Sequence, residues 1–247
     1  MRLAVPDFPL ARFALATEFV AAKRYDEAAT ELSTFISAAP RADDRLPARI
    51  LRGHLFIAQG RTDEAVAEFR TLVGLFPARR RPRENLANLL LSRPADRDEA
   101  ASHYRILLRR QPDNTGWLVN LGVALASTGR TGDAAQLFQR ALQIDPALPS
   151  AHARLAQLLL NEGRTGEAAK HAAAVIAAEP RDATAHNLLG VASAMEGRFT
   201  DAVPHFEISI GLDPEYTDAH DNLLRTRRAL GVTDEVPSEA SAHGPEQ

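Results

Sequence analysis

The chain has 247 residues, of which 45% are hydrophobic and 25% charged, a composition typical of a globular protein with a substantial core. Its net charge of −3 favours neither nucleic acid nor an anionic membrane as a partner. The absence of cysteine excludes disulfides, thiolate metal sites and a cysteine nucleophile. No apolar run reaches the ~20 residues that a membrane span needs, and the first residues do not resemble a signal peptide, so we expect a cytoplasmic protein.

One short turn sequence recurs along the chain. It reads GRTDEA from Gly60, GRTGDAA from Gly129, GRTGEAA from Gly163 and GRFTDA from Gly197. The last three glycines are 34 residues apart (163 − 129 = 34 and 197 − 163 = 34). A period of this length is typical of solenoids, which stack one small structural unit many times.

The period divides the chain into units that each predict two antiparallel helices joined by a turn. After a lead over 1–8, the units are 9–42, 46–79, 80–114, 115–148, 149–182 and 183–216. One further helix over 218–231 has a polar face suited to the water-facing end of a stack. The acidic segment 232–247 lacks apolar residues to bury and predicts a disordered tail.

Three units depart from the pattern. Lys23 stands where the turn glycine is usual in the first unit, and residues 43–45 are inserted before the second. The third unit has Pro94 in place of the glycine and one extra residue. We expect this third unit to be the weakest place in the stack, because one-dimensional stacks fail locally at poor interfaces.

The remaining repeated positions have a physical explanation. The turn glycine allows a positive φ just after the first helix of a pair. Thr62, Thr131 and Thr165 are expected to cap the second helix, whose positive end favours the acidic residues that follow. Positions are counted from the first residue of a unit. Small residues at positions 8 and 20 let the two helices of the unit approach closely, and proline at position 32 ends the second helix.

These residues carry a resemblance to a known family. The unit 115–148 has, at its repeated positions, Leu121, Gly122, Leu125, Gly129, Ala134, Phe138, Ala141 and Pro146. The chain resembles the tetratricopeptide repeat (TPR) family over roughly 9–231. The resemblance implies an all-α, right-handed superhelical solenoid of antiparallel helix pairs.

No pattern in the sequence predicts catalysis, a metal or a cofactor. There is no glycine-rich phosphate loop, no G-x-S-x-G and no H-E-x-x-H. His152, His186 and His220 share one position in consecutive units, and His171 and His205 share another. Neighbouring units are about 10 Å apart, whereas zinc–nitrogen bonds are about 2 Å, so one ion does not bridge two units. We predict that these histidines fill packing positions and that the protein is not an enzyme.

Arginines form two further patterns. The cluster RRRPR at 79–83 is predicted to be either a solvated loop or a contact for phosphate or an acidic partner. Arg61, Arg130, Arg164 and Arg198 follow the turn glycines and are expected to form a row, favoured by the nearby helix C-terminus. Trp117, the only tryptophan, is expected to pack against the neighbouring unit.

The resemblance also implies a function, because TPR proteins usually hold a peptide or helix of another protein against the first helices of the units. We therefore predict a protein–protein interaction scaffold or adaptor. The alternative is an accessory subunit that presents substrates to a glycosyltransferase or sulfotransferase. The sequence does not name the partner.

Carried onto this chain, the groove positions are apolar at the N-terminal end and polar elsewhere. The apolar ones include Phe13 and Ile50, and the polar ones include Asn85, Asn88, Asn120, Arg154, Gln157, Asn161, Asn187, Asn222 and Arg225. We expect a partner segment with an apolar anchor at one end and acidic residues at the other, since amides bind a peptide backbone and arginines bind carboxylates. Asn120, Arg154 and Arg225 are expected to be solvent-exposed. Alternatively, these polar residues only keep the surface hydrated.

Overall fold

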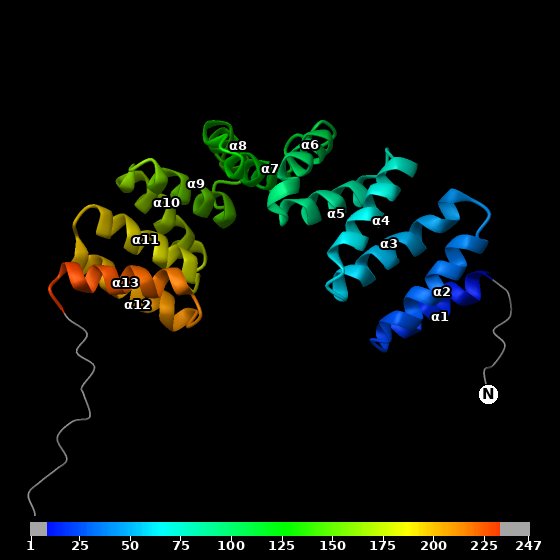
Figure 1. Cartoon of the computed structure of the whole chain (residues 1–247). Helices are drawn as coiled ribbons and strands as arrows, with labels where there is room; N and C mark the ends of the chain where they lie inside the picture. Colours follow the sequence, from blue (N-terminus) through cyan, green and yellow to red (C-terminus); the bar gives the residue numbers. More distant parts are fainter. Residues whose placement is uncertain (1–8, 233–247) are drawn as a thin grey trace, which may run out of the picture. The chain divides into compact units, whose positions relative to one another are not determined.

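The computed structural model describes residues 9–232, which divide between Ala134 and Ala135 into two compact units (Figure 1). The first unit contains α1 (Pro9–Ala21), α2 (Tyr25–Ala38), α3 (Ala42–Ala58), α4 (Thr62–Leu75), α5 (Arg80–Leu91), a 3-10 helix η1 (Pro94–Asp96), α6 (Arg97–Leu108), α7 (Thr115–Ser127) and the start of α8 (Thr131–Ile144). The second contains the rest of α8, α9 (Pro149–Asn161), α10 (Thr165–Ala178), α11 (Ala183–Met195), α12 (Phe199–Leu212) and α13 (Thr217–Ala229).

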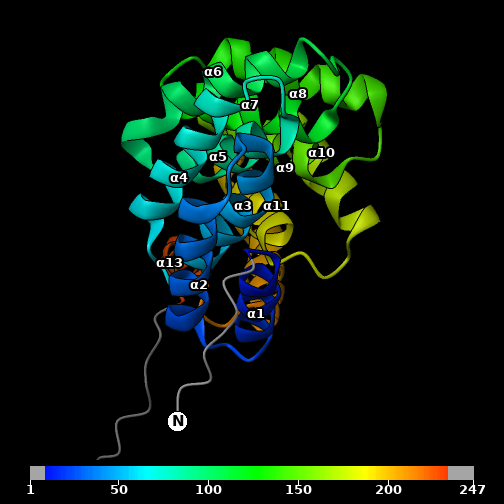
Figure 2. The ribbon, with the colours of Figure 1, turned by 90° about the vertical axis from the view of Figure 1, so that its right-hand side faces the viewer.

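Within each compact unit, helices that follow one another in the chain pack together. In the first unit α1 packs on α2, α3 on α4 and α5 on α6, and in the second α9 packs on α10 and α11 on α12 (Figures 1 and 2). No strand occurs within 9–232. The predicted class, an all-α solenoid of antiparallel helix pairs, is confirmed. The predicted lead 1–8, and the predicted tail beyond Val232, lie outside the described residues.

The turn glycines adopt the left-handed conformation that the sequence predicts. Gly60, Gly163 and Gly197 have φ values of 72°, 74° and 76°. The amide of the following residue then reaches back into the helix, as where Arg61 N–H donates to the Phe56 carbonyl at 2.8 Å. This bond satisfies a carbonyl that the helix end would leave unpaired. Lys23 takes the same conformation with φ 57°, although its side chain disfavours it.

The prediction that threonine caps the second helix of a pair is wrong for α4 and α10. These helices begin at Thr62 and Thr165, so their cap residues are Arg61 and Arg164, and neither side chain accepts a capping hydrogen bond. Each arginine instead donates to a glutamate three residues later: Arg61 to Glu64 at 2.9 Å and Arg164 to Glu167 at 2.7 Å. The recurring arginine therefore bridges the turn to the first residues of the second helix.

Small residues inside the pairs have the predicted role. A Cβ atom built on Gly53 would lie 2.7 Å from Cζ of Phe69, and one on Gly190 would lie 2.6 Å from Cε1 of Phe206. Both phenylalanine rings are fully buried. The first helix must lack a side chain at this position because an aromatic ring from the second helix occupies the space.

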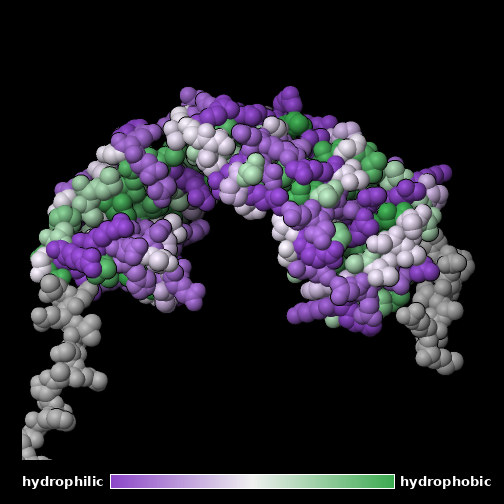
Figure 3. Space-filling view, in the orientation of Figure 1, coloured by the Kyte–Doolittle hydropathy of each residue, from purple (hydrophilic) through white to green (hydrophobic). Residues whose placement is uncertain are grey.

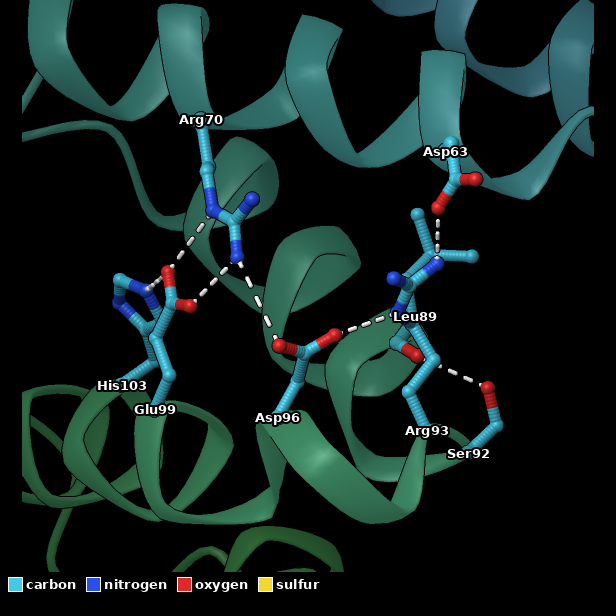
Figure 4. Close-up of polar contacts among 8 residues, drawn as sticks. All are labelled: Asp63, Arg70, Leu89, Ser92, Arg93, Asp96, Glu99 and His103. Atoms are coloured by element: carbon cyan, nitrogen blue, oxygen red, sulfur yellow. Dashed lines mark hydrogen bonds and ion pairs between the residues drawn. The ribbon is translucent and has the colours of Figure 1, made fainter.

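The irregular third unit is accommodated by η1. Arg93 pairs with Asp63 of α4 and with Asp96 of η1, and Arg70 of α4 pairs with Glu99 of α6 at 2.6 Å (Figure 4). The residue that replaces the turn glycine, Pro94, is the first residue of η1. The inserted residues 43–45 lie inside α3, which begins at Ala42, so that insertion lengthens a helix.

Candidate functional site

The residues predicted to line a groove all lie on the first helix of a pair or on α13. Phe13 is on α1, Ile50 on α3, Asn85 and Asn88 on α5, Asn120 on α7, Arg154, Gln157 and Asn161 on α9, Asn187 on α11, and Asn222 and Arg225 on α13.

The first unit has a surface hollow of about 730 Å³ formed by α1, α3 and the start of α5. We call it the α1–α3–α5 groove, and its lining residues are Phe13, Thr17, Leu46, Pro47, Ile50, Leu51, His54, Arg79, Arg80, Arg81 and Pro82. Most of the visible molecular surface is hydrophilic, with apolar side chains in separate patches (Figure 3). A groove with six apolar lining residues is therefore a distinct feature of this unit.

The apolar floor of the groove is held by the core beneath it. Phe13 packs against the buried cluster that includes Leu32 and Phe35, and the Phe13 and Phe35 rings have centroids 5.6 Å apart. Phe13 and Ile50 are both half-buried, so each keeps some apolar area accessible to a ligand. The structure thus brings together two of the apolar residues that the sequence predicted.

Three exposed arginines stand at the edge of this floor. Arg79 precedes α5, and Arg80 and Arg81 begin it. Arg79 lies 3.9 Å from Asp43 and Arg80 lies 4.0 Å from Glu84, both at the outer limit of an ion pair. Exposed pairs of this kind contribute little, and cations at a helix N-terminus are disfavoured by the helix dipole. The groove therefore has positive charge that an acidic ligand would balance.

This arrangement differs from the predicted one. The sequence placed the cationic contacts at Arg154 and Arg225, whereas the groove has its cations at Arg79, Arg80 and Arg81, beside the apolar floor. The segment 79–83 is also not a solvated loop, because α5 begins at Arg80 and both Pro82 and Arg83 are buried. The run of arginines was the signal for this site, but the sequence did not show that α5 begins inside it.

The asparagines of the first unit are bonded to other side chains. The hydroxyl of buried Tyr104 donates to Asn88 Oδ1 at 2.6 Å and accepts from Asn120 Nδ2 at 3.2 Å. Asn85 Nδ2 lies 2.9 Å from His54 Nε2. Burial raises the pKa of Tyr104 to about 12, so its hydroxyl stays protonated as a donor. The prediction that Asn120 is solvent-exposed is wrong, because it is half-buried and ties α7 to α5 and α6.

The second unit repeats this amide arrangement. Asn187 is only 5% exposed, and its Nδ2 lies 3.3 Å from the Tyr216 hydroxyl. Asn222 Nδ2 donates to Asn187 Oδ1 at 3.0 Å, which joins α13 to α11. Asn187 is therefore a structural contact between helices. The other predicted residues of this unit, Arg154, Gln157, Asn161 and Arg225, are exposed.

The recurring histidines form pairs within a helix pair. Nδ1 of His152 lies 2.8 Å from Nδ1 of His171, and the corresponding atoms of His186 and His205 are 3.3 Å apart. Burial, and then the neighbouring histidine, lowers the pKa of His171 and of His205. Both histidines of each pair belong to one unit, whereas the 34-residue spacing in the sequence relates histidines of neighbouring units and does not predict these pairs. Within 9–232, no three histidine or acidic side chains come together as metal ligands.

The TPR family model matches residues 50–95, 95–149 and 153–217, about two thirds of the chain. No curated protein sequence matches the chain. Among solved structures, a TPR protein from Parabacteroides merdae has a TM-score of 0.78 at 17% identity, covering 91% of this chain and 87% of its own. PilW, a type IV pilus biogenesis factor, has a TM-score of 0.69 at 19% identity, covering 89% and 100%.

YrrB, described as a TPR protein with an unusual peptide-binding site, has a TM-score of 0.54 at 22% identity, covering 70% of this chain and 89% of its own. These likenesses show a shared fold. Within the described part of the chain, every helix is too short or too polar to cross a membrane. Because the family model matches three successive segments and the helix pairs stack as the repeat requires, the chain belongs to the tetratricopeptide repeat family.

Proposed function

We propose that this protein is a non-catalytic interaction scaffold that binds a segment of a partner protein in the α1–α3–α5 groove. TPR proteins bind other proteins, and the TPR family model matches residues 50–95, 95–149 and 153–217 of this chain. The single observation that supports this site is the combination of an apolar floor, including Phe13 and Ile50, with three exposed arginines in one hollow.

The chemistry of the groove selects the kind of segment. An apolar side chain placed on Phe13 and Ile50 removes apolar surface from water, which contributes about 25 cal/mol per Å². Carboxylates next to that side chain form charge-assisted hydrogen bonds with Arg79, Arg80 or Arg81. We therefore propose an extended or partly helical segment in which acidic residues stand close to an apolar anchor.

Photo-crosslinking tests where a partner binds. A photoreactive amino acid replaces Thr17, which is exposed and lines the groove, and in a second variant replaces Thr71, which is exposed on α4 away from it. Both variants are irradiated in native lysate, and the crosslinked segments are sequenced. We expect one segment with an apolar residue near acidic ones to crosslink from position 17 and not from position 71.

The affinity of that segment, as a synthetic peptide, is then measured against charge-reversal variants. Arg81→Glu removes a groove cation, and Arg105→Glu makes the same change at an exposed position of α6 outside the groove. We expect the first to weaken binding about tenfold or more, the effect of one charge-assisted hydrogen bond, and the second to have little effect. Equal crosslinking from both positions, or equal effects of both variants, would contradict the proposal.

A further inference from the structure

A second, smaller hollow of about 200 Å³ adjoins the groove and is lined by four arginines. We call it the arginine pocket. Arg79 and Arg80 line both hollows, and the other polar or aromatic residues of the smaller one are Arg83, Arg110, Gln111 and Trp117. Its remaining walls include apolar residues of α6, and none of its lining residues is acidic. The pocket thus concentrates positive charge in a confined space.

The deepest arginine of the pocket has no carboxylate partner within the described residues. Arg83 is 8% exposed, and it donates from Nη2 to the Pro77 carbonyl at 3.1 Å and from Nη1 to His103 Nδ1 at 3.1 Å. Burial, and then Arg83, lowers the pKa of His103, so this histidine is a neutral acceptor. A nearly buried guanidinium therefore faces only neutral acceptors, although buried charges are normally paired.

The surrounding charges add to this imbalance. Burial, followed by repulsion from Arg110 and Arg109, lowers the pKa of Arg83. Arg110 donates to the Ala78 carbonyl at 2.7 Å and forms no ion pair with the described residues. The nearest glutamate of α5, Glu84, does not line the pocket and accepts from Trp117 Nε1 at 3.0 Å. No carboxylate of the described residues therefore balances the charges of Arg83 and Arg110.

We propose that the arginine pocket binds a phosphate monoester carried as phosphoserine or phosphothreonine on the partner segment that occupies the α1–α3–α5 groove. A phosphate monoester carries nearly two negative charges and three acceptor oxygens, which suits several converging guanidinium groups better than a single carboxylate does. Arg79 and Arg80 line both hollows, so one segment reaches both. The attachment to a partner segment rests on the proposed function, whereas phosphate binding by the pocket does not.

Trp117 is the only tryptophan and lines the pocket, so its fluorescence reports occupancy in the full chain. We would titrate inorganic phosphate, N-acetylphosphoserine amide, and a phosphoserine peptide with a leucine and glutamates nearby, alongside its unphosphorylated form. Ionic strength is held constant with sodium chloride, because screening alone alters weak electrostatic binding. Arg110→Gln removes a pocket cation, and Arg105→Gln is the matched control at an exposed position of α6 that does not line the pocket.

We expect saturable binding of all three phosphate-containing probes, weakened about tenfold by Arg110→Gln and little by Arg105→Gln. The phosphopeptide is expected to bind most tightly. Arg81→Glu is expected to weaken binding of the phosphopeptide without changing the binding of inorganic phosphate. If the two glutamine variants weaken binding equally, or if the tryptophan fluorescence shows no saturable change, the arginine pocket is not a phosphate-binding site.

If inorganic phosphate binds and N-acetylphosphoserine amide does not, the proposal of a phosphorylated partner is wrong and the ligand of the pocket is free phosphate. If the phosphopeptide binds tightly and Arg81→Glu does not weaken its binding, the peptide does not occupy the α1–α3–α5 groove. Phosphate binding by the arginine pocket would still be supported. Arg83→Lys is a further test, because lysine keeps the charge and loses the forked geometry of the guanidinium. We expect it to bind phosphate more weakly than the wild-type protein.

Discussion

At the scale of single residues, the backbone of each turn explains its glycine. Gly163 has φ 74°, and a Cβ built on it would meet no atom within 4 Å. The glycine is therefore needed for its conformation and not for space. Gly211, near the end of α12, also has free space around a built Cβ, and it has no positive φ.

Gly163→Ala and Gly211→Ala are predicted to change stability in opposite directions. A left-handed alanine costs about 1–2 kcal/mol, partly offset by the lower entropy of the unfolded chain, so Gly163→Ala should destabilise the protein by about 1 kcal/mol. Gly211→Ala should stabilise it by about 0.5 kcal/mol because alanine is the better helix former. Thermal unfolding of both variants checks this, and a loss of stability in each would contradict it.

At the scale of elements, polar contacts determine how neighbouring helices are tied. Glu68 on α4 is buried and binds Arg49 at 2.9 Å and Arg52 at 2.6 Å on α3. Asparagine and tyrosine side chains join α5, α6 and α7 in the first unit and α11 and α13 in the second. The histidine pairs join α9 to α10 and α11 to α12.

The histidine pairs are predicted to make the protein less stable in mild acid. Folding lowers the pKa of His171 and His205, so the unfolded chain binds protons more readily. Stability is therefore lost as pH falls below the unfolded pKa of about 6.5. Folding also lowers the pKa of glutamates such as Glu167 from 4.5, and the stability that these groups contribute is lost only below about that pH.

The measurement is the melting temperature at pH 7.5 and pH 5.5, in the wild-type chain and in a His171→Gln/His205→Gln variant. The variant should lose less stability between the two values than the wild-type chain does. Part of the pH dependence should remain, because His103 also has a lowered pKa. An unchanged pH dependence would show that these pairs do not contribute.

Hydrogen exchange is predicted to be fastest, within 9–231, around residues 78–83 and 92–98 of the third unit. Arg93 and Arg70 connect α4 to η1 and α6 (Figure 4), but their side chains are 35% and 47% exposed. Exposed ion pairs contribute little and are screened by salt. Exchange at 92–98 should therefore accelerate further in high salt, and uniform protection along the chain would contradict this prediction.

At the scale of the whole molecule, stability comes from the stacking of helix pairs, each of which leaves an apolar face for the next. Segments that bury no apolar surface should not contribute to it. We predict that removing residues 232–247 leaves the melting temperature unchanged, because this segment has few apolar residues to bury. Thermal unfolding of the shortened chain checks this, and a decrease of several degrees would show that the segment docks on the repeats.

The sequence by itself determined the family, the helical class and the turns. The 34-residue period, the turn glycines and the small residues opposite Phe69 and Phe206 are local or nearly local signals, because each unit folds largely on its own residues and its nearest neighbours. A positive φ at Gly163 follows from the turn alone.

Only the tertiary structure decided which polar residues are available to a ligand. Asn120 and Asn187 occupy groove positions in the pattern, but Tyr104 of α6 bonds to Asn120, and Tyr216, the residue before α13, bonds to Asn187. Arg79, Arg80 and Arg81 form a groove with Phe13 and Ile50, which lie far earlier in the chain. Repeat position fixes the face of a helix on which a side chain lies, whereas hydrogen bonding and burial depend on residues from neighbouring pairs that the repeat pattern leaves free to vary.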